Sequence, residues 1–185
     1  MKRPENRVWR VLSSEYLARR PWFTVRREKV ALPNGTVVPE WYIFEFPDWI
    51  NVIALTREGK FIFISQYRHA IGQTRYELTA GVIDTEDASP EAAARRELLE
   101  ETGYGGGKWE LFMTLSPNPT NHTNMVYTFL ATDVELMAPQ HTEASEDIMV
   151  HLLSRDEVRE LLDEGEIIQA LHAAPLWKFF AQRQR

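Results

Sequence analysis

Apolar and polar positions alternate in short runs over the first 50 residues, which predicts strands joined by turns. Residues 25–32 lead into Asn34-Gly35, a pair typical of a tight hairpin turn, and residues 41–46 form the predicted return strand. Further apolar runs predict strands in the rest of the chain, and we expect one of them to be broken by Ala80-Gly81. These runs are residues 52–55, 61–65, 75–79, 109–115, 125–132 and 148–153.

The segment between the middle strands carries the clearest helix signals. Ser89 is suited to cap a helix that begins at Pro90, because proline at the first helical position loses no hydrogen bond. Gly103 is suited to end the helix, since glycine adopts the left-handed conformation common at helix ends. We therefore predict a helix over residues 91–102.

Two more helical segments follow the last predicted strand. Ser154 and Glu157 form the pattern of a capping box, which predicts a helix as far as Leu162. Residues 166–182 are also predicted to be helical, and Pro175 is expected to kink or divide that segment. The order of strands, helix, strands and helices favours the α/β (α+β) class, with a mixed sheet and helices on both faces.

Composition and charge narrow the class of protein. The 185 residues are 44% hydrophobic and 26% charged, which is ordinary for a soluble domain and leaves room for a small added subdomain. A net charge of -6 without a long basic run argues against a nucleic-acid partner. No apolar run approaches the roughly 18 residues of a membrane span, and the N-terminus lacks a signal-peptide core. We therefore expect a cytoplasmic protein with no membrane partner.

The predicted helix after the acidic loop carries the most informative chemistry. Glu97, Glu100 and Glu101 stand at positions i, i+3 and i+4, so they share one face and repel one another. A solvated surface is one interpretation; a hard divalent cation with oxygen ligands is the other. Arg96 lies four residues before Glu100 and can orient it, and Ala80-Gly81 lets the backbone approach a ligand. These neighbours favour the cation.

The stretch 81–104 resembles the Nudix box, in which a glycine and a glutamate precede Arg-Glu-U-x-Glu-Glu-x-Gly-U, where U is a bulky apolar residue. The chain matches the second half of this pattern from Arg96 to Gly103. It has one residue more than the pattern between the first glycine and the arginine. We therefore expect Glu86 or Asp87 to do the work of the pattern's first glutamate.

Segments on either side are similar to the ADP-ribose pyrophosphatase branch of that family. Gln66-Tyr67-Arg68 is followed by Glu-Leu-Thr-Ala-Gly over residues 77–81, with Thr79 where the branch has proline. The loop 116–119 falls where the branch has its downstream proline. The resemblance covers residues 20–180 and implies an α/β/α sandwich with a mixed sheet. It also implies an N-terminal antiparallel β subdomain, residues 1–48, that contributes to a homodimer and to substrate stacking, followed by a Nudix hydrolase domain, residues 49–185.

The resemblance also implies site residues and a cofactor. The cofactor is Mg²⁺ or Mn²⁺, held by the Ala80 carbonyl, Glu97, Glu100 and Glu101. The implied catalytic residues are Glu97, Glu101, Arg96 and a general base, for which Glu143 and Glu146 are candidates and His122 a further one. The implied substrate-binding residues are Arg68, Glu77, Trp22 and Pro119.

By this resemblance the protein hydrolyses the diphosphate bond of a nucleotide sugar, most simply ADP-ribose to AMP and ribose 5-phosphate. GDP-mannose or another nucleotide sugar is the nearest alternative substrate. A sensor that binds a nucleotide sugar without cleaving it is an alternative of another class, and an acidic helix with only a structural role is a third. The sequence leaves open the physiological substrate, the general base, the number of metal ions and the oligomeric state.

Overall fold

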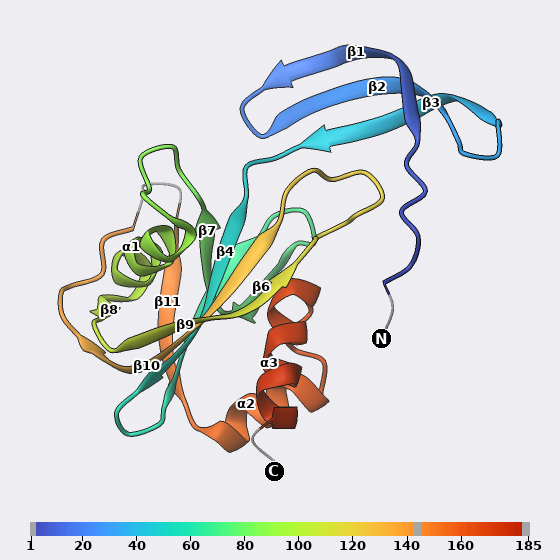
Figure 1. Ribbon diagram of the computed structural model, residues 1–185. Helices are drawn as coiled ribbons and strands as arrows, with labels where there is room; N and C mark the ends of the chain where they lie inside the picture. Colours follow the sequence, from blue (N-terminus) through green and yellow to red (C-terminus); the bar gives the residue numbers. More distant parts are fainter. Residues whose placement is uncertain (1–2, 143–145, 183–185) are drawn as a thin grey trace. The chain divides into compact units, whose positions relative to one another are not determined.

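The computed structural model describes residues 3–142 and 146–182 and divides the chain into two compact units (Figure 1). The smaller unit consists of the first 46 residues together with Ser116–Asn124. The larger unit consists of Pro47–Leu115 and the chain from Met125 onward. Each unit has its own set of internal contacts.

The smaller unit contains a three-stranded antiparallel sheet in the order β1-β2-β3. The predicted hairpin turn is confirmed: Gly35 has a φ of 86°, and the Thr36 N–H donates to Oδ1 of Asn34 over 3.0 Å. The return strand starts earlier than predicted, and the first strand was not predicted separately. The strands are β1 (Arg10–Arg20), β2 (Phe23–Ala31) and β3 (Val37–Glu45).

The larger unit is a mixed sheet with α1 on one face and α2 and α3 on the other, which confirms the predicted fold class (Figure 1). The main strand order is β11-β5-β4-β10-β8, and β4 and β10 run parallel. The strands are β4 (Trp49–Thr56), β5 (Phe61–Arg68), β6 (Gln73–Glu77), β7 (Thr79–Val82), β8 (Tyr104–Gly105), β9 (Lys108–Leu115), β10 (Val126–Leu136) and β11 (Ile148–Leu153). The helices are α1 (Pro90–Thr102), α2 (Arg155–Asp163) and α3 (Ala170–Gln182).

The sheet forks between β4 and β5, and this fork positions the candidate site. β4 and β5 pair directly only at Ala54–Ile62 and Leu55–Phe61. Beyond that point β7 pairs with β4 and β6 pairs with β5, so the β6–β7 segment fills the fork. The prediction that Ala80-Gly81 breaks the strand is wrong. The break falls at Leu78, which is fully buried and whose N–H donates to His172 Nδ1 instead of a neighbouring strand.

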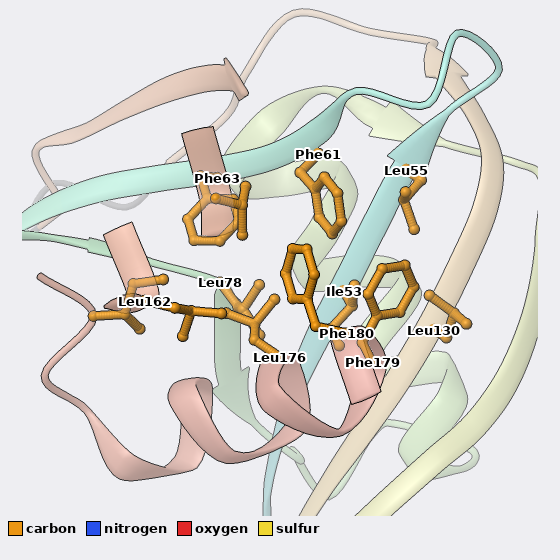
Figure 2. Close-up of a cluster of buried hydrophobic side chains, with 12 residues drawn as sticks. Ile53, Leu55, Phe61, Phe63, Leu78, Leu130, Leu162, Leu176, Phe179 and Phe180 are labelled. Carbon is orange, nitrogen blue, oxygen red and sulfur yellow. The ribbon is translucent and has the colours of Figure 1, made fainter. Parts of the chain in front are cut away.

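Two hydrophobic clusters hold the helices to the sheet. Figure 2 shows the cluster beneath α2 and α3, where Phe61 and Phe63 of β5 meet Leu176 and Phe179 of α3. The rings of Phe61 and Phe179 pack edge to face, with centroids 5.3 Å apart. The second cluster lies beneath α1 and includes Leu98. Both faces of the sheet are therefore buried, which explains why the central strands read as continuous apolar runs.

The caps of α1 and α2 are those that the sequence predicts. The Ser89 hydroxyl accepts from the Ala92 N–H over 3.1 Å, and Gly103 closes α1 in the left-handed conformation with a φ of 75°. In α2, Ser154 and Glu157 form both hydrogen bonds of a capping box. These caps fix where α1 begins and ends, and so fix which of its residues face the sheet.

The last helix starts later than predicted, and of the two effects expected of Pro175, division of the segment does not occur. It begins at Ala170 rather than at residue 166, and Pro175 lies inside a single helix without dividing it. Proline has no N–H, so the carbonyl of Leu171, four residues earlier, receives no bond from it. The side-chain Nδ2 of Asn51 donates to that carbonyl over 2.8 Å. A side chain from β4 thus replaces the missing helical hydrogen bond.

Candidate active site

Helix α1 places the three glutamates of its acidic face at different depths. Glu101 stands three positions after the buried Leu98, so it faces the sheet and is only 4% exposed. The side chain of Glu97 is 14% exposed, whereas that of Glu100 is 43% exposed. The helix therefore carries two carboxylates inward and leaves one near solvent.

Gly81 of β7 provides the space that the inward carboxylate of Glu97 needs. A Cβ atom at Gly81 would lie 2.1 Å from Glu97 Oε1 and 2.2 Å from its Cδ. Those separations are far below any van der Waals contact, so only glycine lets Glu97 lie against the strand. This contact gives the glycine that opens the box pattern a physical reason.

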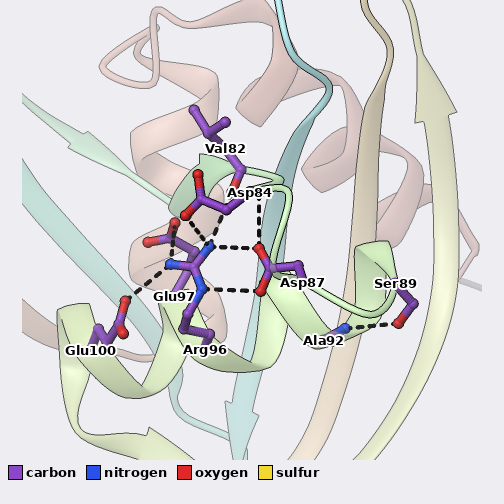
Figure 3. A network of polar contacts seen from close by, with 8 residues as sticks. All are labelled: Val82, Asp84, Asp87, Ser89, Ala92, Arg96, Glu97 and Glu100. Atoms are coloured by element: carbon purple, nitrogen blue, oxygen red, sulfur yellow. Dashed lines mark hydrogen bonds and ion pairs between the residues drawn. The ribbon is translucent and has the colours of Figure 1, made fainter.

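Arg96 ties the acidic helix to the loop that follows β7 (Figure 3). Its Nη1 donates to Glu97 Oε1 over 2.9 Å and to Glu100 Oε2 over 3.1 Å. Its Nε and Nη2 donate to the two carboxylate oxygens of Asp87 over 3.1 and 2.9 Å, and Nη2 also reaches the Val82 carbonyl. The Asp87 hydrogen bonds, together with both glutamates, raise the pKa of Arg96, which stays charged.

The loop between β7 and α1 is organised by Asp87. Besides the pair of bonds from Arg96, Asp87 Oδ2 accepts from the Asp84 N–H over 2.9 Å. The Arg96 hydrogen bonds lower the pKa of Asp87. Glu86 is exposed. Of the two residues that the sequence offered for the box's first glutamate, Asp87 is the one in contact with Arg96.

Removing the Asp87 carboxylate is expected to destabilise the protein and to disturb Arg96. Asp87→Ala should lower the free energy of unfolding by about 1–3 kcal/mol, because it strips hydrogen-bonded partners from a partly buried cation. We expect a roughly 10-fold loss of hydrolytic activity with it, as Arg96 no longer holds Glu97 in place. Urea unfolding and initial rates measure both quantities. Glu86→Ala is the matched control, and equal effects of the two substitutions would contradict the assignment.

Burial makes the two inward carboxyl groups weaker acids than usual. Burial raises the pKa of Glu97 to about 7, an effect that Arg96 partly offsets and that Glu100 and Glu146 reinforce. Burial, with the charges of Glu97 and Glu146, raises the pKa of Glu101 to about 8, although the Ala80 backbone N–H donates to it. Two carboxyl groups whose pKa values lie near 7 and 8 therefore share a poorly solvated site. Such a site favours a positively charged partner.

The raised pKa of Glu101 predicts a pH-dependent effect of Glu101→Gln on stability. Between about pH 4.5 and pH 8 the folded chain keeps a proton on Glu101 that the unfolded chain has lost, so stability falls as pH rises through this window. The neutral glutamine carries no such cost. In metal-free buffer at pH 8.5 we expect Glu101→Gln to raise Tm by at least about 4 °C. The difference should vanish near pH 4.5, and differential scanning calorimetry at both values measures it. A Tm below that of the wild type at pH 8.5 would contradict the burial of this charge.

Arg68, Glu77 and Glu146 complete the charged surroundings. Arg68 donates through Nε and Nη2 to the two oxygens of Glu77, over 2.8 and 2.5 Å. This pair, with the charges of Glu101 and Glu146, raises the pKa of Arg68. The charge of Glu146 also acts on Glu97. The structure thus brings Arg68, held by Glu77, and Glu146 from different parts of the sequence to the acidic helix.

The site has the chemistry of a divalent-cation site. Glu101 Oε2 is buried without a hydrogen-bond partner, and a buried carboxylate oxygen left without one is costly. The donors are all oxygens, as Mg²⁺ and Mn²⁺ prefer. Within residues 3–142 and 146–182, no three acidic or imidazole side chains already form a group able to hold a metal. Arg96 engages Glu97 and Glu100, so water and substrate oxygens would have to complete a metal shell.

Two residues from the sequence-based prediction, Trp22 and Pro119, belong to the smaller unit. Trp22, at the tip of the β1–β2 hairpin, is 68% exposed and has a φ of 62°. Pro119 is exposed in the Ser116–Asn124 segment of the same unit. Glu143 lies outside the described residues. His122, the further candidate base, packs against the ring of Phe46, with centroids 5.0 Å apart. Their roles stay predictions.

The buried residues Asn51 and His172 were missed by the sequence reasoning. Both line a pocket beside Ala80 and Gly81. His172 follows a stretch with no motif, so it offers no local signal. Asn51 is a polar residue inside the apolar run 49–56, and that is the one clue the sequence contains.

Family models match both parts of the chain. The model described as "Nucleoside diphosphate sugar hydrolase N-terminal domain" matches residues 9–44, and the NUDIX domain model matches residues 46–173. The chain belongs to the Nudix family. The acidic helix and Gly81 are thus the parts of this Nudix hydrolase that carry the family's pattern.

Individual relatives agree with the family assignment. An ADP-ribose pyrophosphatase of Mycobacterium tuberculosis is 30% identical over 165 residues, which cover 88% of this chain and 79% of that protein. An ADP-ribose pyrophosphatase of Bacillus subtilis is 31% identical over 145 residues, 77% of each. The fold is similar to the crystal structure of an ADP compounds hydrolase, with a TM-score of 0.82 at 21% identity, covering 100% of this chain and 98% of that one.

Among the described residues, none of the helices combines the length and the hydropathy needed to cross a bilayer.

Proposed function

We propose that this Nudix hydrolase cleaves the diphosphate bond of a nucleoside diphosphate sugar and requires Mg²⁺ or Mn²⁺. The observation that carries the proposal is the buried Glu101 carboxylate, which has one oxygen without a partner and lies beside a second inward carboxylate. The names of the two relatives above, both ADP-ribose pyrophosphatases, support the substrate class.

In this proposal, Glu97 and Glu101 are the principal metal ligands, helped by Glu100 and the carbonyl of Ala80. The loss of the proton that each inward carboxylate holds near neutral pH accompanies binding. A divalent cation there would polarise the phosphoryl group and lower the pKa of the attacking water. The depth of Glu101 and the position of Gly81 keep both carboxylates fixed before substrate arrives.

The two arginines have different tasks. Arg96 is already bound to Asp87, Glu97 and Glu100, so it positions carboxylates. Arg68 is held by Glu77, and its Nη1 has no hydrogen-bond partner within the described residues. We assign this nitrogen to a phosphate oxygen of the substrate, because a guanidinium binds phosphate through charge-assisted hydrogen bonds. Glu77 contributes to substrate binding by fixing Arg68.

The general base is assigned to the loop after β10. Glu146 is the candidate within the described residues, since its charge raises the pKa of both Glu97 and Glu101. Glu143 is the other candidate. Comparing Glu146→Gln with Glu143→Gln separates them: the substitution at the base should lower kcat by about 10²–10⁴-fold and leave metal binding intact.

The smaller unit is assigned to dimerisation and substrate stacking. Its sheet exposes apolar side chains, including Val11 and Leu17 on β1, each 52% exposed, and Phe23 on β2, 56% exposed. We propose a division into residues 1–48 and 49–185, a homodimer through the first part, and substrate contacts from Trp22 and Pro119. Light scattering on the purified protein should give twice the mass of one chain.

A panel of nucleotide sugars with Mg²⁺ tests the proposed activity. ADP-ribose is expected to be cleaved to AMP and ribose 5-phosphate faster than GDP-mannose and ADP-glucose. Chromatography of the products identifies which bond is broken. Preference for GDP-mannose would keep the reaction and change the substrate. Binding of these compounds without any product, under all metal conditions, would favour the sensor over the enzyme.

A further inference from the structure

A pocket lies against β7 on the side that faces α3. Its volume is about 310 Å³, at the lower end of the roughly 300–1,000 Å³ typical of small-molecule sites. Val82, Val126 and Leu171 give it apolar walls, and Asn51 and His172 give it polar groups. The volume suits one moiety of a substrate, and the two polar groups determine which kind of moiety it is.

Asn51 lines this pocket and has a hydrogen-bond acceptor without a partner. Its Nδ2 is committed to the Leu171 carbonyl, which Pro175 leaves without a helical partner. That bond fixes the orientation of the amide, because a carbonyl accepts only from the NH₂ side. Asn51 is 1% exposed, and its Oδ1 has no hydrogen-bond partner. A buried acceptor of this kind requires a donor.

His172 presents the complementary donor. It is 2% exposed, and its Nδ1 accepts from the Leu78 N–H over 3.2 Å. A neutral ring that accepts at Nδ1 carries its proton on Nε2. Burial lowers the pKa of His172 to about 4, so the ring is neutral at physiological pH. Within the described residues, Nε2 has no acceptor.

One strand joins the pocket to the acidic helix. Ala80 and Gly81 line the pocket, and the same two residues contact Glu101 and Glu97. Arg68 also lines the pocket, while its partner Glu77 and the charge of Glu101 place it beside the carboxylates. A diphosphate held by Arg68 and the acidic helix therefore has the pocket next to it.

We propose that this pocket binds a sugar ring attached to the diphosphate, with its hydroxyl groups donating to Asn51 and accepting from His172. The proposal rests on the function proposed above. A hydroxyl both donates and accepts, so a sugar satisfies both groups. An anion would face the carbonyl oxygen of Asn51, which disfavours it.

The chain offers a variant that removes the acceptor without the structural cost. Asn51→Ala alone leaves the Leu171 carbonyl unpaired, whereas adding Pro175→Ala restores a backbone N–H that bonds to it within α3. The double variant N51A/P175A is compared with P175A alone. Calorimetry with Mg²⁺ measures the binding of three uncleavable probes: methylenediphosphonate, α,β-methylene ADP, and the α,β-methylene analogue of ADP-ribose. Tm confirms that both variants fold.

The proposal predicts that N51A/P175A binds a sugar-bearing probe about 3- to 10-fold more weakly than P175A, with methylenediphosphonate unchanged. Weakening of the ADP-ribose analogue alone assigns the pocket to the distal sugar. Weakening of α,β-methylene ADP as well assigns it to the ribose of the nucleoside. Equal weakening of all three probes, or no change, would overturn the proposal and leave Asn51 a structural role. If the wild type still hydrolyses nucleotide sugars in that case, the proposed function stands. If no probe binds the wild type, the pocket proposal and the proposed function both fail.

Discussion

Glu101→Gln is expected to lower kcat/KM for nucleotide-sugar hydrolysis by at least about 10²-fold. Losses of this size are typical when one group that stabilises the charge of the transition state is removed. The substitution keeps the size of the side chain and its acceptor for the Ala80 N–H. It removes the negative charge that the site holds in a buried position. Initial rates with ADP-ribose and Mg²⁺, with product chromatography, measure the loss.

The control for this substitution lies on the same helix. Glu91→Gln removes an exposed carboxylate from the first turn of α1, where it pairs with Arg95. Its activity should equal that of the wild type, because surface ion pairs of this kind contribute little. Full activity of Glu101→Gln would remove Glu101 from the metal site. Combined with a raised Tm at pH 8.5, loss of activity shows that the residue is retained for function at the expense of stability.

Gly81→Ala is expected to cause the second large loss. The added methyl group would overlap the carboxylate of Glu97, which must then leave its place beside β7. We expect activity to fall by about 10²-fold and the free energy of unfolding to fall by about 1–3 kcal/mol, as for other overpacked sites. Initial rates and urea unfolding measure the two effects.

The double variant Gly81→Ala/Glu97→Ala separates the clash from the chemistry. Removing the Glu97 side chain relieves the overlap, so stability should return toward that of the wild type. Activity should not return, because a metal ligand is missing. If Gly81→Ala alone kept full activity, the position of Glu97 against the strand would not matter to the reaction.

Local signals explain which parts of the fold were predictable. Ser89, Gly103 and the Ser154–Glu157 capping box act through hydrogen bonds between near neighbours, so the sequence contains all that decides them. The boundary between β6 and β7 is different. The strand is interrupted at Leu78 because His172, 94 residues later, accepts a hydrogen bond from the Leu78 N–H. No window of sequence around Ala80 contains that partner.

The candidate site divides along the same line. The spacing of Glu97, Glu100 and Glu101 predicted a shared face, and the structure places two of them inward. Which two depends on the packing of α1 on β7, a tertiary contact. The role of Asn51 lies further from any sequence signal, since it depends on Pro175 in another element. A side chain whose hydrogen-bond partner is a distant backbone group cannot be found from a local motif.

The most direct test of the account is the binding of Mn²⁺ to the protein without substrate, followed by electron paramagnetic resonance at pH 8. The account predicts that the wild type binds Mn²⁺ and that Glu101→Gln binds it at least about 10-fold more weakly, while Glu91→Gln binds it like the wild type. Equal binding by the wild type and Glu101→Gln would contradict the claim that the buried carboxylates of α1 hold the metal.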